Sequence, residues 1–441
     1  MSLALRRNRD LPPDNTAAHE AATLRQISRR LVPFLLGCYF FAFISRTNAG
    51  LAALQMNRDV GLSPAAFGFG GSLFFVSYTL FGIPCNLALV RVGARRWLTL
   101  MIFALGLTSL AMALVTGPIS FSIARFFLGA AEAGFFPGAV YYLTCWFPLD
   151  YRARIIAAFM LAIPLSSFLG SPLSAALLGL EGRAGLHGWQ WMFLLEALPI
   201  FGLGAGAFFL LPDNPAAARW LQPAQSEWLA MRLAAERSAA PTVAQPPLWR
   251  VLVDARVLLL SLAYAASSAA SNSLSLWQPQ IIKAFGMDNL RTGFINAIPF
   301  GLGALAMILW GRHSDQTGRH RRSTALPLLL CAGSLSLTLL VRSLPFTIVL
   351  LSVAMIGTYA IKGPFWALAA SWLSPSTTAT GIAAINTLAH VATFGAIYLI
   401  GFIKSATGSY PLALLPLVFL GLGGAGGLLL AGDRGGKTRV S

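Results

Sequence analysis

The sequence predicts an all-α integral membrane protein with twelve transmembrane helices in two pseudo-symmetric six-helix bundles. Three observations support this prediction. Of the 441 residues, 56% are hydrophobic and only 11% are charged, whereas a soluble protein carries about 25% charged residues. The mean hydropathy is +0.69. Twelve segments supply the roughly 20 apolar residues that a bilayer-crossing helix needs, and one polar interval divides them six and six.

Hydropathy places each span in order. The first bundle, 31–211, contains spans at 31–54, 66–89, 97–116, 119–145, 155–179 and 189–211. The second bundle, 254–431, contains spans at 256–282, 292–311, 324–342, 345–372, 379–403 and 410–431. The proline-rich interval 212–253 is predicted to be a central cytoplasmic loop, and 1–30 and 432–441 to be cytoplasmic tails. Within the loop, SEWLAMRLAAER (226–237) favours a short helix near the membrane over a loose linker, because apolar and charged residues alternate at helical spacing.

Basic residues gather on one side of the predicted membrane. Of the 32 lysines and arginines, 23 lie in the tails and the loops of one side, six lie on the other side and three lie inside spans. This bias is typical of cytoplasmic loops, so both termini are predicted to be cytoplasmic. The net charge of +17 therefore indicates orientation in the membrane. It does not indicate nucleic-acid binding, which needs a basic face on a soluble domain.

Inside the spans, positive charge exceeds negative charge. The spans contain two carboxylates, Glu132 and Glu196, against the cations Arg46, Arg125 and Lys362. Charge inside a membrane is costly and is usually paired or functional. An interior short of negative charge suggests that an anion from outside completes the balance. We therefore expect a carrier for an organic anion.

The two halves share a short motif. After the second span comes GIPCNLALVRVGARR (82–96), and after the eighth comes GRHSDQTGRHRR (311–322). Each has a glycine at the helix end and another glycine followed by arginines, at the same place in its half. Internal repeats of this kind occur in many secondary transporters, which bind their substrate at the interface between the repeats.

The second copy resembles the G-x-x-x-D-x-x-G-R-R loop of the major facilitator superfamily, through Gly311, Asp315, Gly318 and Arg319. The resemblance implies a twelve-helix fold in which this loop makes charge contacts that hold one conformational state. The first copy departs from the pattern, because Val90 stands where an acid is usual.

A narrower resemblance is to the anion:cation symporter family. It rests on RFFLGAAEAGFFPGAVYYLTCWFP (125–148) and on RTNAGLAALQMNRDVGLS (46–63), WMFLLEALP (191–199), LWQPQIIKAFG (276–286) and GPFWALAASWLS (363–374). The tartrate/phthalate group is the most similar. The resemblance implies uptake of a small organic acid with protons across the bacterial inner membrane. We expect a monomer without a cofactor and with H⁺ as the coupling ion.

Arg125 and Glu132 lie seven residues apart on the fourth span. Two helical turns put both on one face, roughly 10 Å apart along the axis, so they cannot easily pair. In the functional interpretation, Arg125 holds a substrate carboxylate and Glu132 takes up and releases a proton, roles that the resemblance supports. The alternative is a fixed polar contact between helices. Glu196 lies in a stretch that looks structural in the family and ranks below Glu132.

Arg46 is the second candidate for holding a carboxylate, because a guanidinium can bind one through two parallel hydrogen bonds. The alternative is that its side chain extends to the membrane interface. The family often has an acid just before this arginine, and here Ser45 occupies that position. This departure removes a candidate proton site.

Five further residues complete the candidate site. Lys362 could contact the substrate, or its amine could reach the cytoplasmic edge of the membrane. Trp366, one turn away, could line the substrate site, or it could only pack against neighbouring helices. Asn386 and Tyr78 match positions that line the cavity in the family. His390 shares a helix face with Asn386 and could tune proton coupling, although a neutral hydrogen-bonded ring is the alternative.

No motif predicts an enzyme. GxSxG, HExxH and Walker sequences do not occur. The four cysteines lack metal-ligand spacing, and the five histidines are scattered, so we expect neither disulfides nor a metal site. Two other functions remain open: a drug:proton antiporter of the same fold, and a membrane sensor that binds the anion without moving it.

Overall fold

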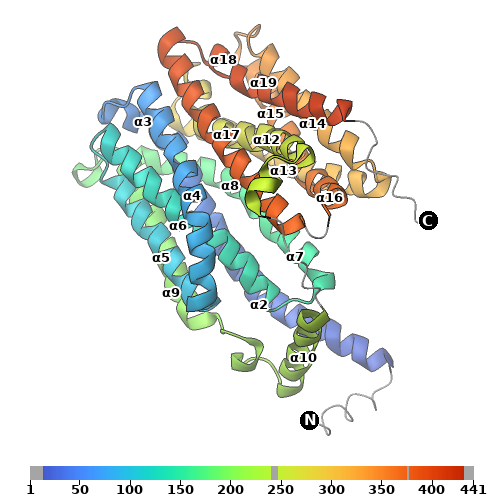
Figure 1. Ribbon diagram of the computed structural model, residues 1–441. Coiled ribbons are helices and arrows are strands. Elements are labelled where there is room, and N and C mark those ends of the chain that lie inside the picture. Colours follow the sequence, from blue (N-terminus) through green and yellow to red (C-terminus); the bar gives the residue numbers. More distant parts are fainter. Residues whose placement is uncertain (1–12, 240–246, 375–376, 432–441) are drawn as a thin grey trace.

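The structure is a computed structural model that describes residues 13–239, 247–374 and 377–431 (Figure 1). These residues form helices and connecting turns, with no strand among them. The first half comprises α2 (Pro13–Thr47), α3 (Ala49–Asp59), α4 (Pro64–Val92), α5 (Ala94–Ala113), α6 (Pro118–Thr144), α7 (Leu149–Met160), α8 (Ala162–Leu177) and α9 (Gly188–Leu210). The short 3₁₀ turns η1 (Leu178–Leu180) and η2 (Arg183–Gly185) connect α8 to α9.

The second half comprises α12 (Ala255–Lys283), α13 (Asn289–Thr317), α14 (His320–Leu337), α15 (Leu344–Ala360), α16 (Lys362–Trp372), α17 (Thr378–Thr407), α18 (Tyr410–Ala413) and α19 (Leu415–Leu430). Eleven segments of the described chain are long and apolar enough to cross a membrane. The predicted span 324–342 corresponds to α14, which is absent from these eleven because it is short and begins with three basic residues. With α14 packed between α15 and α19, the expected all-helical architecture is confirmed.

Helix α2 begins before the predicted first span. Residues 13–30 continue it outward, so this part of the predicted tail is helical. Its position in the cytoplasm stays a prediction, and residues 1–12 and 432–441 lie outside the described chain. The reason for the helix is local, because the segment is rich in alanine and other helix formers and contains no glycine. Leu24 and Ile27 on this extension are buried. Gln26 Nε2 donates a hydrogen bond of 2.7 Å to the Trp220 carbonyl.

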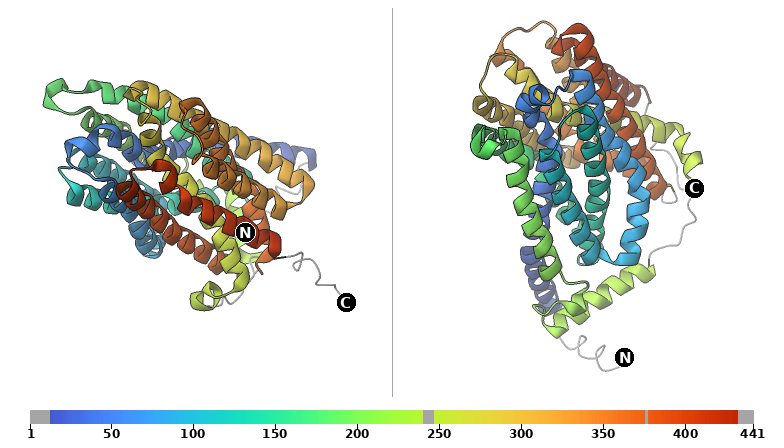
Figure 2. Two further views of the ribbon diagram at one scale, coloured as in Figure 1. Left: turned by 90° about the horizontal axis from the view of Figure 1, so that it is seen from above. Right: turned by 90° about the vertical axis from the view of Figure 1, so that its left-hand side faces the viewer.

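The interval between the halves contains η3 (Pro215–Ala217), α10 (Pro223–Ala239) and α11 (Leu248–Leu252). Helix α10 confirms the helix predicted at 226–237. It is held against the first half by ion pairs from Arg152 to Glu236 and from Arg232 to Asp150, at 3.2 and 3.1 Å. Figure 2 shows α10 crossing beneath the ends of the first-half helices. This helix therefore packs on one half.

The two halves approach closely at one end of the bundle, opposite to the end where α2 begins. A Cβ built on Gly401 of α17 would lie 3.0 Å from the Gly68 Cα on α4, and one built on Gly50 of α3 would lie 2.7 Å from the Ser275 carbonyl on α12. In Figure 1 the lower ends of α2 and α9 extend beyond the second half together with α10. The contacts between the halves are thus concentrated at one side, which is typical of one of two alternating states.

Part of the repeated motif, which was predicted to be a loop, is helical in the structure. Gly311 and Asp315 are on α13, and only Gly318, with φ of 64°, and Arg319 form the turn to α14. Asp315 and Arg319 are exposed. In the first copy, Arg95 donates to the Phe208 carbonyl at 2.9 Å and pairs with Asp213 at 3.2 Å. This pair gives the first copy an acidic partner that Val90 cannot supply.

Candidate functional site

Arg46 joins charged and polar groups of both halves. It lies in the last turn of α2, and its Nη1 forms a 2.9 Å ion pair with Oε1 of Glu132 on α6. Its Nη2 donates a 3.0 Å hydrogen bond to Oδ1 of Asn272 on α12, in the second half. The guanidinium carbon lies 4.6 Å from the centre of the Phe74 ring. One side chain therefore connects the proton-site candidate to the opposite half.

The ion pair changes how Arg46 can act. The sequence predicts Arg46 as an anion-holding residue, but its charge is matched by Glu132, so it is not free to hold an anion while Glu132 is ionised. Glu132 is 1% exposed. Burial of two opposite charges is favourable only when their geometry and hydrogen bonds are good, so this pair is sensitive to the protonation of Glu132.

Arg125 lies beside this pair without a carboxylate of its own. It is 3% exposed, and its Nη1 donates a 3.1 Å hydrogen bond to the Arg46 carbonyl. No described carboxylate lies within ion-pair distance of Arg125, and Nε of Arg125 and Oε2 of Glu132 have no hydrogen-bond partner among the described residues. Buried polar atoms are nearly always paired. Arg125 has an unpaired guanidinium nitrogen and contacts the backbone of Arg46, whose partner Glu132 has an unpaired carboxylate oxygen. These two unpaired atoms are places where an anion and a proton could bind.

In the second half, Lys362 and Trp366 share an aromatic neighbour. Lys362 begins α16 directly after the break that ends α15, and its Nζ lies 5.7 Å from the centre of the Tyr264 ring. Trp366 and Tyr264 have ring centres 5.1 Å apart. No described carboxylate pairs with Lys362, and its charge and that of Arg46 repel each other. A cation near aromatic faces is partly compensated, yet it still lacks a counter-anion.

Tyr78 and His390 meet across the halves. Their ring centres are 4.8 Å apart in an edge-to-face arrangement between α4 and α17. Asn386 lies one turn before His390 and donates its amide to the Ile382 carbonyl of its own helix at 2.9 Å. Tyr78 and His390 are therefore in contact, whereas Asn386 has no described contact with the other candidates.

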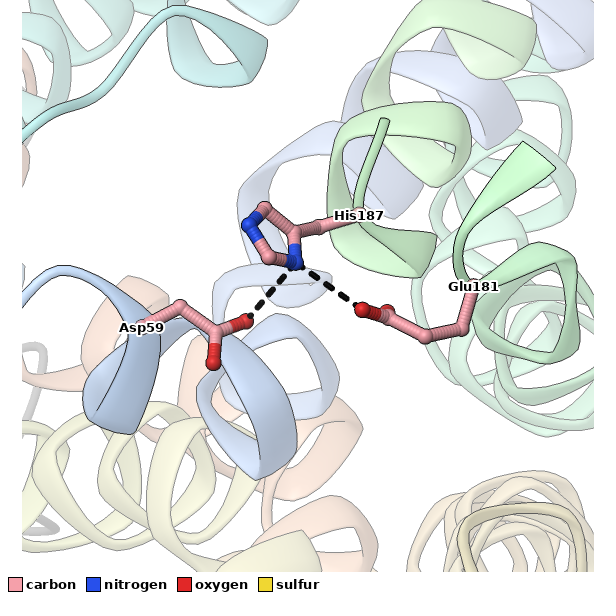
Figure 3. A group of neighbouring side chains, drawn as sticks. All are labelled: Asp59, Glu181 and His187. Atoms are coloured by element: carbon pink, nitrogen blue, oxygen red, sulfur yellow. Dashed lines mark hydrogen bonds and ion pairs between the residues drawn. The ribbon is translucent and has the colours of Figure 1, made fainter. Parts of the chain in front are cut away.

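A histidine also lies beside two carboxylates near the end of α3, away from these residues (Figure 3). His187 Nδ1 is 2.9 Å from Glu181 Oε1 and 3.4 Å from Asp59 Oδ2. Residues distant in sequence meet here, and the expected absence of a metal site stays a prediction. Glu181 also accepts a hydrogen bond from the Gly188 amide, which with His187 holds the Glu181 pKa below its usual range. Trp189 Nε1 donates to Asp59 at 3.2 Å, so these contacts join α3 to the connection between α8 and α9.

Sequence reasoning missed Asn272. It is one polar residue among several serines on α12, and nothing in its local pattern distinguishes it. Its importance comes from facing Arg46 across the halves, which only the tertiary structure shows.

A family model described as "Major Facilitator Superfamily" matches residues 35–397. The chain belongs to the major facilitator superfamily. It is a multi-pass membrane transporter, and the superfamily predicted from the loop motif is confirmed.

The relatives of this transporter differ in what their names say they carry. It is 44% identical over 391 residues to a "Putative tartrate transporter" of Agrobacterium vitis, covering 89% of this chain and 87% of that protein. It is 36% identical over 391 residues to a "Quinolone resistance transporter" of Acinetobacter baumannii, covering 88% and 90%.

A solved structure supports the fold. A bacterial homologue of the human lysosomal transporter Spinster, inward-facing and unoccupied, superimposes with a TM-score of 0.77 at 18% identity, covering 93% of this chain and 98% of that one.

Proposed function

We propose that this transporter takes up a small organic anion together with a proton by alternating access. The observation that carries the proposal is Arg125, which is buried, has no carboxylate partner among the described residues, and donates to the backbone carbonyl of Arg46, the residue paired with Glu132. We place the protein in the bacterial inner membrane as a monomer with both termini in the cytoplasm. It needs no cofactor, and H⁺ is the coupling ion.

Coupling follows from the charges around Glu132. While Glu132 is ionised it neutralises Arg46, and an anion meets one free guanidinium and one carboxylate that repels it. Protonation of Glu132 removes the repulsion and releases Arg46 from its ion pair, so two guanidinium groups can hold one carboxylate. Anion and proton therefore favour each other's binding, and the effect is reciprocal.

The second half supplies the opposite wall of the site. Lys362, with Tyr264 and Trp366 around it, offers a second cation for the far end of the substrate. A site with cations on both halves suits an acid with two anionic or strongly polar ends, as a tartrate-like dicarboxylate has. Asn386 and the Tyr78–His390 contact are proposed to border the same space, with His390 tuning proton uptake.

The contact from Arg46 to Asn272 connects proton binding to movement of the halves. When Arg46 leaves Glu132 to bind substrate, its hydrogen bond to the second half changes with it. Gly311, Asp315, Gly318 and Arg319 lie at the end of the bundle away from the close contacts, and Asp315 is exposed. We propose that these four residues make their contacts in the opposite state.

A second candidate function is drug:proton antiport. The similarity to the quinolone resistance transporter favours it, whereas the cation-rich site opposes it, because cationic and apolar drugs are better bound by an acid-rich cavity. A membrane sensor that binds the anion without moving it is the candidate of another class. Uptake into proteoliposomes distinguishes a carrier from a sensor, and the direction of its pH dependence distinguishes symport from antiport.

The decisive test is Glu132→Gln in proteoliposomes loaded with substrate. We expect exchange of internal for external substrate to persist, because a neutral side chain leaves both guanidinium groups available. Accumulation driven by an inward proton gradient should disappear. Accumulation at the wild-type level by this variant would disprove the coupling role of Glu132.

A further inference from the structure

Glu196 lies in a closed set of three hydrogen-bonded contacts that the transport mechanism does not use. It projects from α9 and is 3% exposed. Its Oε1 is 2.8 Å from Ser174 Oγ on α8, and Ser174 Oγ is 3.0 Å from Oδ1 of Asn48, which lies between α2 and α3. The Asn48 amide closes the set by donating to Glu196 Oε2. We refer to these three residues as the Asn48–Ser174–Glu196 ring.

The ring contains more contacts than an ionised Glu196 can satisfy. Each of the three contacts needs one hydrogen. The Asn48 amide nitrogen faces one neighbour and supplies one, and the Ser174 hydroxyl has a single hydrogen. The third hydrogen must come from the Glu196 carboxyl. Turning the Asn48 amide over changes the direction of the ring but leaves this count unchanged.

The surroundings agree with a neutral carboxyl. Among the described residues, no lysine, arginine or histidine lies within ion-pair distance of Glu196. Ser174 and Asn48 are also buried, at 0% and 2% exposed. An ionised carboxylate at a membrane helix interface without a cation is strongly unfavourable, whereas a fully satisfied polar network is stable and rigid.

The ring holds the segment of the chain that presents Arg46. Asn48 follows Arg46 by two residues, and the backbone N–H of Asn48 donates to the Ile44 carbonyl at 2.9 Å, so all three residues belong to one continuous helical turn. The Arg46 carbonyl in this turn accepts the hydrogen bond from Arg125. Fixing Asn48 to α8 and α9 therefore fixes the backbone on which both arginines depend.

We infer that Glu196 is a positioning residue that stays protonated throughout the transport cycle and orients Arg46 through the Asn48–Ser174–Glu196 ring. Its proton is neither released nor replaced during transport. Glu132 then remains the one carboxylate within the spans that exchanges a proton with transport, and with Ser45 in place of a second acid, each cycle moves one proton through this half.

Infrared spectroscopy of the purified full-length protein in nanodiscs tests the protonation state without any substrate. The wild type minus Glu196→Gln difference spectrum should show a carboxylic acid C=O band at both acidic and alkaline pH. A band that disappears within the pH range of transport, or no band at all, would overturn the inference. This result does not depend on whether the proposed function is correct.

Transport measurements test positioning and rest on the proposed function. A glutamine can reproduce the ring by donating to Ser174 and accepting from Asn48. Glu196→Gln should therefore keep proton-driven uptake, with an unchanged pH profile, within about twofold of wild type, whereas Glu196→Ala and Ser174→Ala should lower uptake roughly tenfold by leaving buried polar groups unpaired.

A matched control for Ser174→Ala is Ser167→Ala. Ser167 is also a buried serine on α8, but its hydroxyl has no hydrogen-bond partner among the described residues. Uptake by Ser167→Ala should stay at the wild-type level. Two results would contradict the inference: a Glu196→Gln protein that fails to fold, or one that retains exchange but loses accumulation.

Discussion

The first half of the bundle and the second half share a repeated fold but differ in their charged groups. The first half contains Arg46, Arg125 and Glu132 in one connected set of contacts. In the second half, Lys362 and His390 face aromatic rings, and the carboxylate of its described spans, Asp315, is exposed near the end of α13. The comparison teaches that pseudo-symmetry of the helices does not extend to the chemistry. In the proposed function, proton exchange belongs to the first half, and the second half offers the anion a cation and aromatic rings.

The largest effect is expected from Arg125→Ala. Because this guanidinium has no carboxylate partner in the described chain, its removal takes away attraction for the anion and leaves Glu132 paired with Arg46. Uptake of labelled acid should fall at least ~100-fold, since losing one partner of a buried charged hydrogen bond costs several kcal/mol. Arg58→Ala is the matched control, because the Arg58 side chain is 89% exposed and pairs only with neighbouring Asp59. Near-normal affinity would refute an anion site at Arg125.

Asn272→Asp would place a carboxylate at the charged site, in the half whose described spans contain Asp315 only near the exposed end of α13. The new charge would lie at Nη2 of Arg46, compete with the substrate and repel it. We expect the substrate dissociation constant, measured by isothermal titration calorimetry, to rise roughly tenfold. This is the change in affinity that one added repulsive charge contact produces. Asn272→Ser, which is neutral, should change it much less. Equal effects of the two variants would mean that charge in this half is unimportant.

Lys362→Gln should have a smaller effect than Arg125→Gln. The Lys362 ammonium is stabilised by the neighbouring aromatic ring and is proposed to contact only the far end of the substrate. We expect affinity for a dicarboxylate to fall about fivefold and affinity for a monocarboxylate to be unchanged, because only the first has a second anionic end. Competition by both acids against labelled substrate measures the difference. Equal losses for both would place Lys362 elsewhere in the mechanism.

The smallest effect is expected at Glu181, which lies outside the charged site of either half. Its pKa is lowered, first by the hydrogen bond from the Gly188 amide and then by His187. A depressed carboxyl pKa contributes stability above its ordinary value of 4.5 and loses it as the pH falls through the folded pKa. Glu181→Gln should therefore lower stability at neutral pH by about 0.5 kcal/mol, as for an exposed pair, and match wild type in acid. Thermal unfolding at the two pH values measures this, and a pH-independent difference would contradict it.

Much of the fold follows from the sequence, because each span needs its own apolar length and the loops separate them clearly. The extension of α2 to Pro13 was not predicted, since hydropathy marks where a helix is apolar and not where it begins. In the site, the spacing of Arg125 and Glu132 correctly excluded a direct pair between them. The pairing of Arg46 with Glu132 could not be predicted, because it depends on how α2 and α6 face each other.

The close approach of Gly68 and Gly401 has a consequence for how the halves move. At this point α4 and α17 touch through backbone atoms, with no side chain from either glycine between them. Interlocked side chains must change rotamer before two packed helices can shift, whereas bare backbones need not. In the proposed alternating access, the halves would roll over one another here with little rearrangement. A methyl group added at Gly401, which would lie 2.4 Å from the Pro64 carbonyl oxygen, would hinder that rolling without touching any charged residue.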